Sequence, residues 1–173
     1  MNGHEKILVL IKEIEQGMAV LTKNEAFLAN FMAQEYALLG RRQTAAIIIA
    51  DTIVNYYTCT ETLFLRISRF FENSLQKEKW HSDLLHKMTL NIEGIRPTVI
   101  SEQTYMNLLE LMKFRHFKRY YFEFEYDWDR LDFLLKKYEQ VKPLLRDNLQ
   151  LFVKFLRELI KEDYDENSRT TLH

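Results

Sequence analysis

Glycine, proline and cysteine are scarce in this chain of 173 residues, which contains four glycines, two prolines and one cysteine. A β-sandwich or a β-barrel of this length needs many more turn-forming residues, so the scarcity favours long helices. The single cysteine, Cys59, excludes an intramolecular disulfide and fits a reducing compartment, from which we expect a cytoplasmic protein. Because Cys59 lies in a helical pattern between Thr58 and Thr60, a small buried residue is favoured over a catalytic thiol.

Long apolar runs and glycine-rich motifs are also lacking. The longest run of small apolar residues, 45–50, is too short to cross a bilayer, and the charges between Glu5 and Glu13 argue against a signal peptide, so we expect no membrane association. The glycine motifs of phosphate-binding loops and serine-hydrolase elbows do not occur. The net charge of −1 provides no overall field for nucleic acid, so binding of that kind needs local clusters.

Apolar residues recur at alternating intervals of three and four along most of the chain, as in amphipathic helices that pack in a bundle. Gly40 is expected to end the first helix, which is either long or bent near Asn24, and Ser101 is expected to cap a later one. Pro143 either kinks the last helix or begins a new one. The predicted helices cover about residues 7–39, 42–71 and 80–91, one helix that begins after residue 101, and one or two after residue 128.

These patterns predict an all-α fold, an up-and-down bundle of five to six helices in a single domain over residues 1–162. Residues 163–173 are expected to form a polar, frayed tail. Residues 73–79 are expected to be a polar break between the second and the third helix.

Glu61 interrupts the otherwise apolar seam of the second helix, between Tyr57 and Phe64. Burying a carboxylate alone is costly, so Glu61 needs a hydrogen-bonding or cationic partner. Two alternatives stay open: a structural acid in the bundle core, or a member of a polar cleft shared with the functional segment described next.

Glu78 and His81 form an E-x-x-H spacing, which places two potential metal ligands on one helix face. A di-iron carboxylate bundle needs two such motifs and further glutamates on facing helices, and this sequence has one motif. His86 adds a second imidazole, but no cysteine or aspartate joins it at ligand spacing. We therefore expect neither a metal nor another cofactor.

The aromatic–basic segment, residues 113–122, is the part of the chain richest in functional chemistry. Basic groups neutralise phosphates and aromatic faces stack on unpaired bases, so an RNA surface is one interpretation. The other is an ordinary amphipathic helix whose cations extend over a packed face, and the acidic run at residues 123–132 would then neutralise them. The basic residues of the segment are Lys113, Arg115, Lys118 and Arg119, with His116 among them.

Helical geometry relates these side chains. On an ideal helix Arg115, Arg119 and Phe122 continue one buried apolar stripe, while His116 and Tyr120 are neighbours on an adjacent face. Arg115 and Tyr120 are about 140° apart around the axis. These two side chains therefore meet only if the helix ends there or if a second copy of the chain supplies one of them.

Four short stretches occur in a characteristic order and spacing. They are Tyr56-Tyr57-x-x-x-Glu61-x-x-Phe64, Trp80-His81-x-x-Leu84-Leu85, Arg96-Pro97-x-Val99-Ile100-Ser101 and Leu108-Leu109-Glu110-Leu111-Met112-x-Phe114-Arg115-His116. In this order they resemble the HEPN superfamily, and more narrowly the HepT-like ribonuclease toxins. The resemblance covers about residues 56–159.

The resemblance implies a two-fold symmetric homodimer of helical bundles, in which an R-x4-H-x-Y motif from each subunit lines a shared cleft. In that family the arginine and the histidine cut RNA without a metal, by helping the ribose 2′-hydroxyl attack the adjacent phosphate. A guanidinium matches phosphate charge, and an imidazole moves protons near neutral pH. The implied partner is an MNT-like nucleotidyltransferase, the antitoxin of a type VII pair, which modifies the motif tyrosine.

This sequence departs from the motif at two positions. Arg115 stands at the arginine position, but Tyr120 stands at the histidine position and Phe122 at the tyrosine position. A phenol, with an ordinary pKa of about 10, is a poor proton shuttle at neutral pH, and a phenyl ring has no hydroxyl to modify. His116 is a second candidate for the base.

Two functions stay open, beside a purely structural bundle. In a metal-independent endoribonuclease, Arg115 would stabilise the phosphate charge, His116 or Tyr120 would move the proton, and Glu61 and Phe122 would support the site. The alternative is a non-catalytic dimeric module that binds RNA, a nucleotide or a nucleotidyltransferase. The contacts to an RNA backbone would come from Lys113, Lys118 and Arg119.

Overall fold

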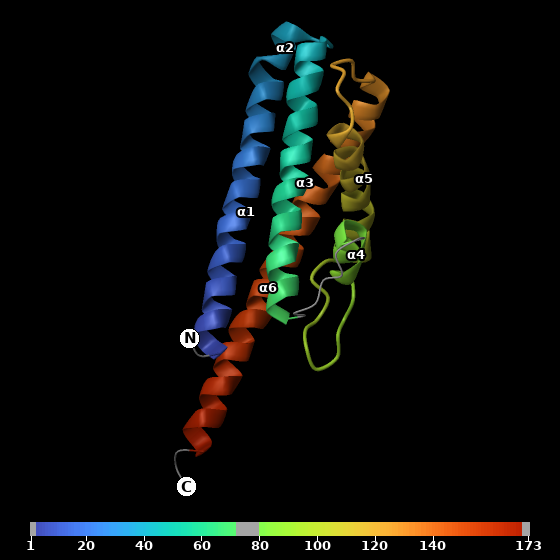
Figure 1. Ribbon diagram of the computed structural model, residues 1–173. Coiled ribbons are helices and arrows are strands. Elements are labelled where there is room, and N and C mark those ends of the chain that lie inside the picture. The colour runs from blue at the N-terminus through green and yellow to red at the C-terminus, as the bar shows by residue number, and fades with distance from the viewer. Residues whose placement is uncertain (1–2, 72–79, 171–173) are drawn as a thin grey trace.

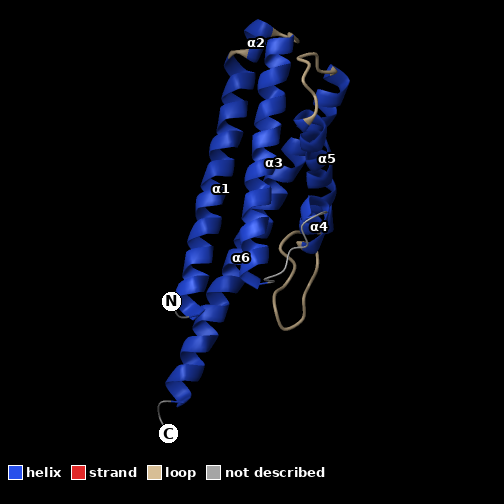
Figure 2. Ribbon diagram, in the orientation of Figure 1, coloured by secondary structure: helices blue, strands red, loops and turns tan. Residues whose placement is uncertain are grey.

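The computed structural model describes residues 3–71 and 80–170, with side chains described at 3–71 and 84–161. Within these ranges the regular elements are helices joined by loops, as Figure 2 shows. The six helices of the described residues are α1 (Gly3–Gln34), α2 (Tyr36–Leu39), α3 (Gln43–Phe71), α4 (Trp80–Lys87), α5 (Glu102–Arg119) and α6 (Trp128–Thr170).

Four long helices run alternately up and down (Figure 1). Helices α1 and α3 pack side by side and are joined at one end through α2, while α6 packs against α1, α3 and α5. The start of α1 and the end of α6 lie at the same end of the bundle. The all-α, up-and-down bundle predicted from the sequence is confirmed. Five to six helices were predicted, and the described residues contain six.

The first helix is continuous through Asn24. It breaks at Glu35, and the short α2 that follows ends at Gly40, whose positive φ of 61° is a backbone conformation that glycine adopts readily. Asn24 stays helical while its side chain connects three helices. Its Nδ2 donates to the carbonyl of Thr52 at 3.0 Å, and its Oδ1 accepts from the hydroxyl of Tyr138 at 2.9 Å.

The third helix is shorter than predicted, because α4 ends at Lys87 rather than near residue 91. Buried Arg96, which is 2% exposed, donates to the carbonyls of Lys87, Leu90 and Pro97 at 2.9, 3.1 and 3.2 Å. These hydrogen bonds satisfy the carbonyl of the last helical residue and two carbonyls of the segment that follows it, and so hold the turn after the helix. The polar break predicted at residues 73–79 lies outside the described residues.

Helix α6 continues through Pro143, so of the two alternatives for this proline the start of a new helix is wrong. The helix extends to Thr170, past the boundary predicted at residue 162. The polar segment that follows this boundary is therefore helical up to Thr170. That residues 163–173 form a tail outside the domain stays a prediction.

Candidate functional site at the end of α5

Helix α5 ends at Arg119, in the middle of the aromatic–basic segment. Tyr120 is its C-cap, and residues 121–127 form an irregular loop. Phe122 is 84% exposed and Arg119 is also exposed, so the prediction that both continue a buried stripe is wrong. The stripe stops because the helical repeat that generates it stops at Arg119.

Arg115 lies against α3. Its Nη2 is 3.2 Å from a carboxylate oxygen of Glu61, and its Nε donates to the hydroxyl of Thr58 at 3.2 Å. The side chains of Arg115 and Glu61 are 20% and 6% exposed. Glu61 therefore has the cationic partner that its buried position requires, and this partner belongs to the predicted functional segment.

The surroundings of this ion pair are poorly solvated. Burial, and next the charge of Glu61, raise the pKa of the neighbouring Tyr57, while Arg115 acts in the opposite direction. The Nη1 atom of Arg115 is buried and has no hydrogen-bond partner among the described residues. Water screens such a pair less than it screens a surface salt bridge, so the contact holds Arg115 firmly against α3.

The three other cations of the segment are less available than the sequence suggests. Lys113 pairs with Glu110, one turn away on α5, at 2.7 Å, and Lys118 pairs with Asp51 of α3. The guanidinium of Arg119 lies 5.9 Å from the centre of the Tyr120 ring and forms no ion pair with the described residues. Two of the three predicted phosphate contacts are thus already matched by carboxylates.

Within one chain, the structure does not bring Arg115 and Tyr120 together. The helix does end between them, but Tyr120 is 72% exposed beside Arg119, whereas Arg115 faces α3. His116 follows Arg115 directly in the chain and is half-buried. The residues that do meet are Arg115, Glu61 and Thr58.

The sequence analysis did not predict that Asp51 and Thr58 of α3 contact the segment. Asp51 lies seven residues before Thr58, and Thr58 lies three residues before Glu61. Spacings of three and seven residues place side chains on the same side of a helix. This pattern of polar residues could have indicated that this side of α3 faces the basic helix.

Cys59 is half-buried, and its Sγ donates to the carbonyl of Gly17 at 3.7 Å. Burial raises the pKa of this thiol, so at neutral pH it is protonated, which is the opposite of a reactive thiolate. Glu78 and the side chain of His81 lie outside the described residues. Within the described residues, no group of three or more acidic, histidine or cysteine side chains is placed to hold a metal.

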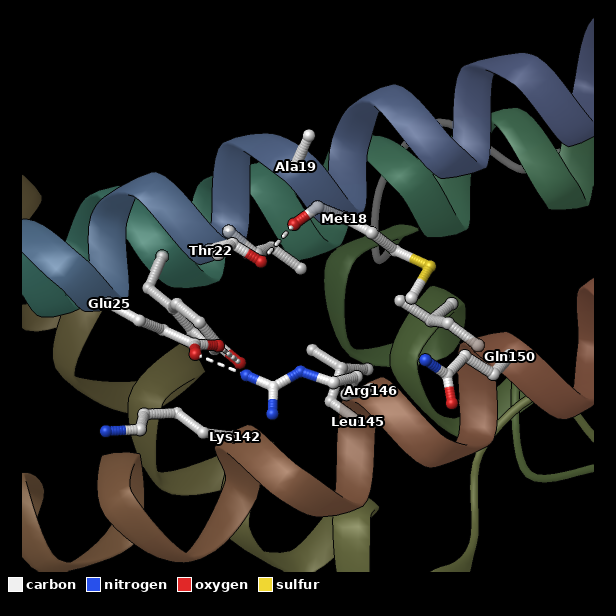
Figure 3. Close-up of a pocket in the computed structure, with 11 residues that line it drawn as sticks. Met18, Ala19, Thr22, Glu25, Lys142, Leu145, Arg146 and Gln150 are labelled. Carbon is white, nitrogen blue, oxygen red and sulfur yellow. Dashed lines mark hydrogen bonds and ion pairs between the residues drawn. The ribbon is translucent and has the colours of Figure 1, made fainter.

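A hollow of about 190 Å³ lies between α1 and α6, on a different part of the bundle (Figure 3). Arg146 of α6 reaches one carboxylate oxygen of Glu25 at 2.6 Å, and the hydroxyl of Tyr56 donates to the other at 3.5 Å. Lys142 at the edge pairs with Glu139 at 2.5 Å. Because its charged groups already pair with one another or with neighbouring side chains, this hollow is a polar contact that connects α1 to α6.

Comparison with known proteins places the chain in a family. A family model described as HepT-like protein matches residues 48–156, more than half of the sequence. The chain belongs to the HepT-like family. No curated protein and no solved structure matches it.

The HepT-like match extends from α3 into α6 and includes both Glu61 and the whole aromatic–basic segment. The resemblance inferred from the four sequence stretches is thus confirmed at the level of the family. Helix α1 lies outside the match, yet it packs along α3 and α6 and supplies Asn24 and Glu25 to their polar contacts. In the part of the chain that the structure describes, none of the helices is long and apolar enough to cross a membrane.

Proposed function

We propose that this HepT-like protein is a non-catalytic dimeric binding module in which the arginine of the family motif has become a structural contact. The observation that supports this most directly is the ion pair between Arg115 and Glu61. The guanidinium charge that a phosphate needs is already matched by a carboxylate at 3.2 Å. A phosphate that displaced Glu61 would separate this buried carboxylate from its guanidinium partner and lose their attraction.

The residues at the other two motif positions support the same proposal. Tyr120 and Phe122 are 72% and 84% exposed and carry a phenol and a phenyl ring where the family has an imidazole and a phenol. Neither ring moves protons readily at neutral pH. Together with the paired Arg115, this leaves binding as the function that the segment fits best.

The exposed rings fit a protein interface. Tyr120, Phe122 and Phe124 are 72%, 84% and 70% exposed and occupy every second position at the start of the loop after α5. Aromatic side chains are enriched at interface cores, so we infer that a second copy covers them in a two-fold dimer. An MNT-like nucleotidyltransferase would bind this dimer without modifying Phe122, which has no hydroxyl.

The second candidate is a metal-independent endoribonuclease toxin, and one observation favours it. Arg115 keeps a buried Nη1 without a hydrogen-bond partner among the described residues, and His116 follows it directly. In this alternative, partner binding would displace Glu61 from Arg115, and His116 would act as the base.

An RNA cleavage assay with restored motif residues separates the two functions. We expect the natural protein to cleave RNA no faster than Arg115→Ala, because the motif lacks its imidazole. Tyr120→His/Phe122→Tyr should also fail to cleave RNA, because Arg115 stays paired with Glu61. Cleavage by the natural protein that Arg115→Ala or His116→Ala abolishes would establish the endoribonuclease instead.

The dimer is tested separately by light scattering. We expect two copies per particle at micromolar concentration, and a shift towards the monomer in Phe122→Ser/Phe124→Ser, which removes two of the three exposed rings without touching the core. His4→Ser, at the opposite end of the bundle, is the control and should leave the dimer intact. A monomeric natural protein at this concentration would contradict the proposal.

A further inference from the structure

Four aromatic side chains surround a small hollow where α5, the following loop and α6 meet. Phe114 and Phe117 belong to α5, and Tyr121 and Tyr126 belong to the loop. Each ring has two of the others as neighbours, so the four rings form a closed set, called here the aromatic cage. The distances between ring centres are 4.8 Å for Phe117–Tyr121, 5.5 Å for Tyr121–Tyr126, 6.1 Å for Phe114–Phe117 and 6.4 Å for Phe114–Tyr126.

A cation of the chain itself already lies against this cage. The Cζ of Arg130, on α6, is 4.2 Å from the centre of the Phe117 ring and 5.7 Å from that of Phe114. Aromatic ring faces attract cations through their quadrupole. In the described parts of the chain Arg130 has no ion pair or hydrogen bond, so the ring faces are the partners of its guanidinium.

The hollow has a volume of about 170 Å³, and its lining also includes Glu125 and Asp127. Both acidic residues are exposed, and one oxygen of Asp127 accepts from the backbone N–H of Asp129 at 2.9 Å. Ring faces and carboxylates both favour a positive ligand, whereas the carboxylates repel the phosphates of a nucleic acid. The charge of the hollow therefore selects a cation.

The geometry points to a binding site for an external guanidinium cation, in the form of an arginine side chain, in the aromatic cage. The ligand stacks on Phe117 in place of Arg130, and Glu125 or Asp127 pairs with its charge. A planar guanidinium is the group already held there, which favours it over a compact ammonium. This inference is independent of the proposed function, because it uses neither Arg115 nor the dimer.

Titration with a charged ligand and its neutral counterpart tests the site. Nα-acetyl-arginine methylamide and the citrulline analogue are added to the natural protein and to Arg130→Met, and binding is followed by NMR of the aromatic side chains. We expect saturable binding of the arginine compound alone, about fivefold tighter in Arg130→Met because the competing guanidinium is gone. Equal binding of the two compounds, equal affinity of the two proteins, or no binding to Arg130→Met would overturn the proposal.

Two matched variants, made in the Arg130→Met protein, assign the binding to the cage. Phe117→Leu keeps an apolar side chain but removes the ring face, and should weaken binding about fivefold, whereas Tyr121→Phe keeps the ring and should bind as before. If Phe117→Leu does not fold, Asp127→Asn preserves the helix cap, removes one charge, and should also weaken binding. Unchanged affinity in Phe117→Leu, or in Asp127→Asn where that variant replaces it, would overturn the site.

The source of the guanidinium is distinguished by a third ligand. A short peptide with one central arginine should bind more tightly than the methylamide if the site takes an arginine of a partner protein. Equal affinity assigns the site to a free cation. Either result requires that the arginine compound binds and the citrulline compound does not.

Discussion

Gly17 lies in the middle of α1, against Leu63 of α3. A Cβ at this position would lie 2.2 Å from Cδ2 and 2.7 Å from Cγ of Leu63, a side chain that is 2% exposed and has little room to move. Overpacking a core costs about 1–3 kcal/mol, while the higher helix propensity of alanine returns about 1 kcal/mol. We expect Gly17→Ala to lower the free energy of unfolding by about 1 kcal/mol, measured by denaturant titration.

Gly3, in the same helix, is the matched control. A Cβ there meets no atom within 4 Å, so Gly3→Ala should leave stability unchanged or raise it slightly. If the contact with Leu63 is the cause, Gly17→Ala should cost less in a Leu63→Ala background, where the space is free. An equal cost in both backgrounds would mean that the strain at Gly17 has another origin.

Also at the scale of residues, Glu61 shows how far sequence reasoning reaches. Its place in an apolar seam required a cationic or hydrogen-bonding partner, because a carboxylate is not buried alone. The partner, Arg115, lies on another helix. Its separation from Glu61 along the sequence does not predict that the two side chains meet. The packing of α5 against α3 decided it.

At the scale of elements, the start of α5 is fixed by a small polar network. The hydroxyl of Ser101 accepts from the backbone N–H of Thr104 at 3.2 Å, as expected of an N-cap. Asn148 of α6 adds a tertiary contact, since its Oδ1 accepts from the N–H of Ser101 at 3.0 Å and from the hydroxyl of Thr104 at 2.6 Å.

We expect Ser101→Ala to destabilise the protein by about 1 kcal/mol, because the N–H of Thr104 loses its acceptor. Ser101→Asp keeps an acceptor at the cap and should cost much less. Thermal unfolding followed by circular dichroism compares the two variants. Equal losses in both would show that the cap contributes little and that the contact with Asn148 holds this end of α5.

The other end of α5 could not be predicted. The chain from Arg115 to Phe122 contains no glycine or proline to stop a helix, and a helical extension through Phe122 was the natural expectation. The structure stops the helix at Arg119, and the loop that follows is held by tertiary contacts. Gln43 at the start of α3 donates to the carbonyl of Tyr126 and accepts from its N–H, at 3.2 and 2.8 Å.

At the scale of the whole molecule, three tyrosines buried between helices make stability depend on alkaline pH. Burial is the largest cause that raises the pKa of Tyr56, Tyr57 and Tyr138 above the ordinary value of 10.0, and nearby carboxylates, Glu25 and Glu61, add to it. The folded state therefore holds these protons more tightly than the unfolded chain. The resulting stability is complete below pH 10 and decreases as the pH rises above it.

We expect the melting temperature to be nearly constant from neutral pH to about pH 9 and to fall steeply above pH 10. Above pH 10 the free energy of unfolding decreases by up to about 1.4 kcal/mol per pH unit for each tyrosine. Tyr57→Phe removes one of the three groups and should make the fall shallower. Tyrosinate absorbance recorded in the same experiment should rise with unfolding. Titration of the buried tyrosines in a protein that stays folded would contradict this account.

The sequence by itself determined the helical class, the approximate extent of the first two long helices and the resemblance to the HepT-like family. It could do so because periodicity, capping and glycine stops act within a few residues of one another. Only the tertiary structure decided that Arg115 pairs with Glu61, that Tyr120 and Phe122 are exposed, and that Arg130 lies against an aromatic cage. These features depend on which helix faces meet, and that is set by the packing of segments far apart in the chain.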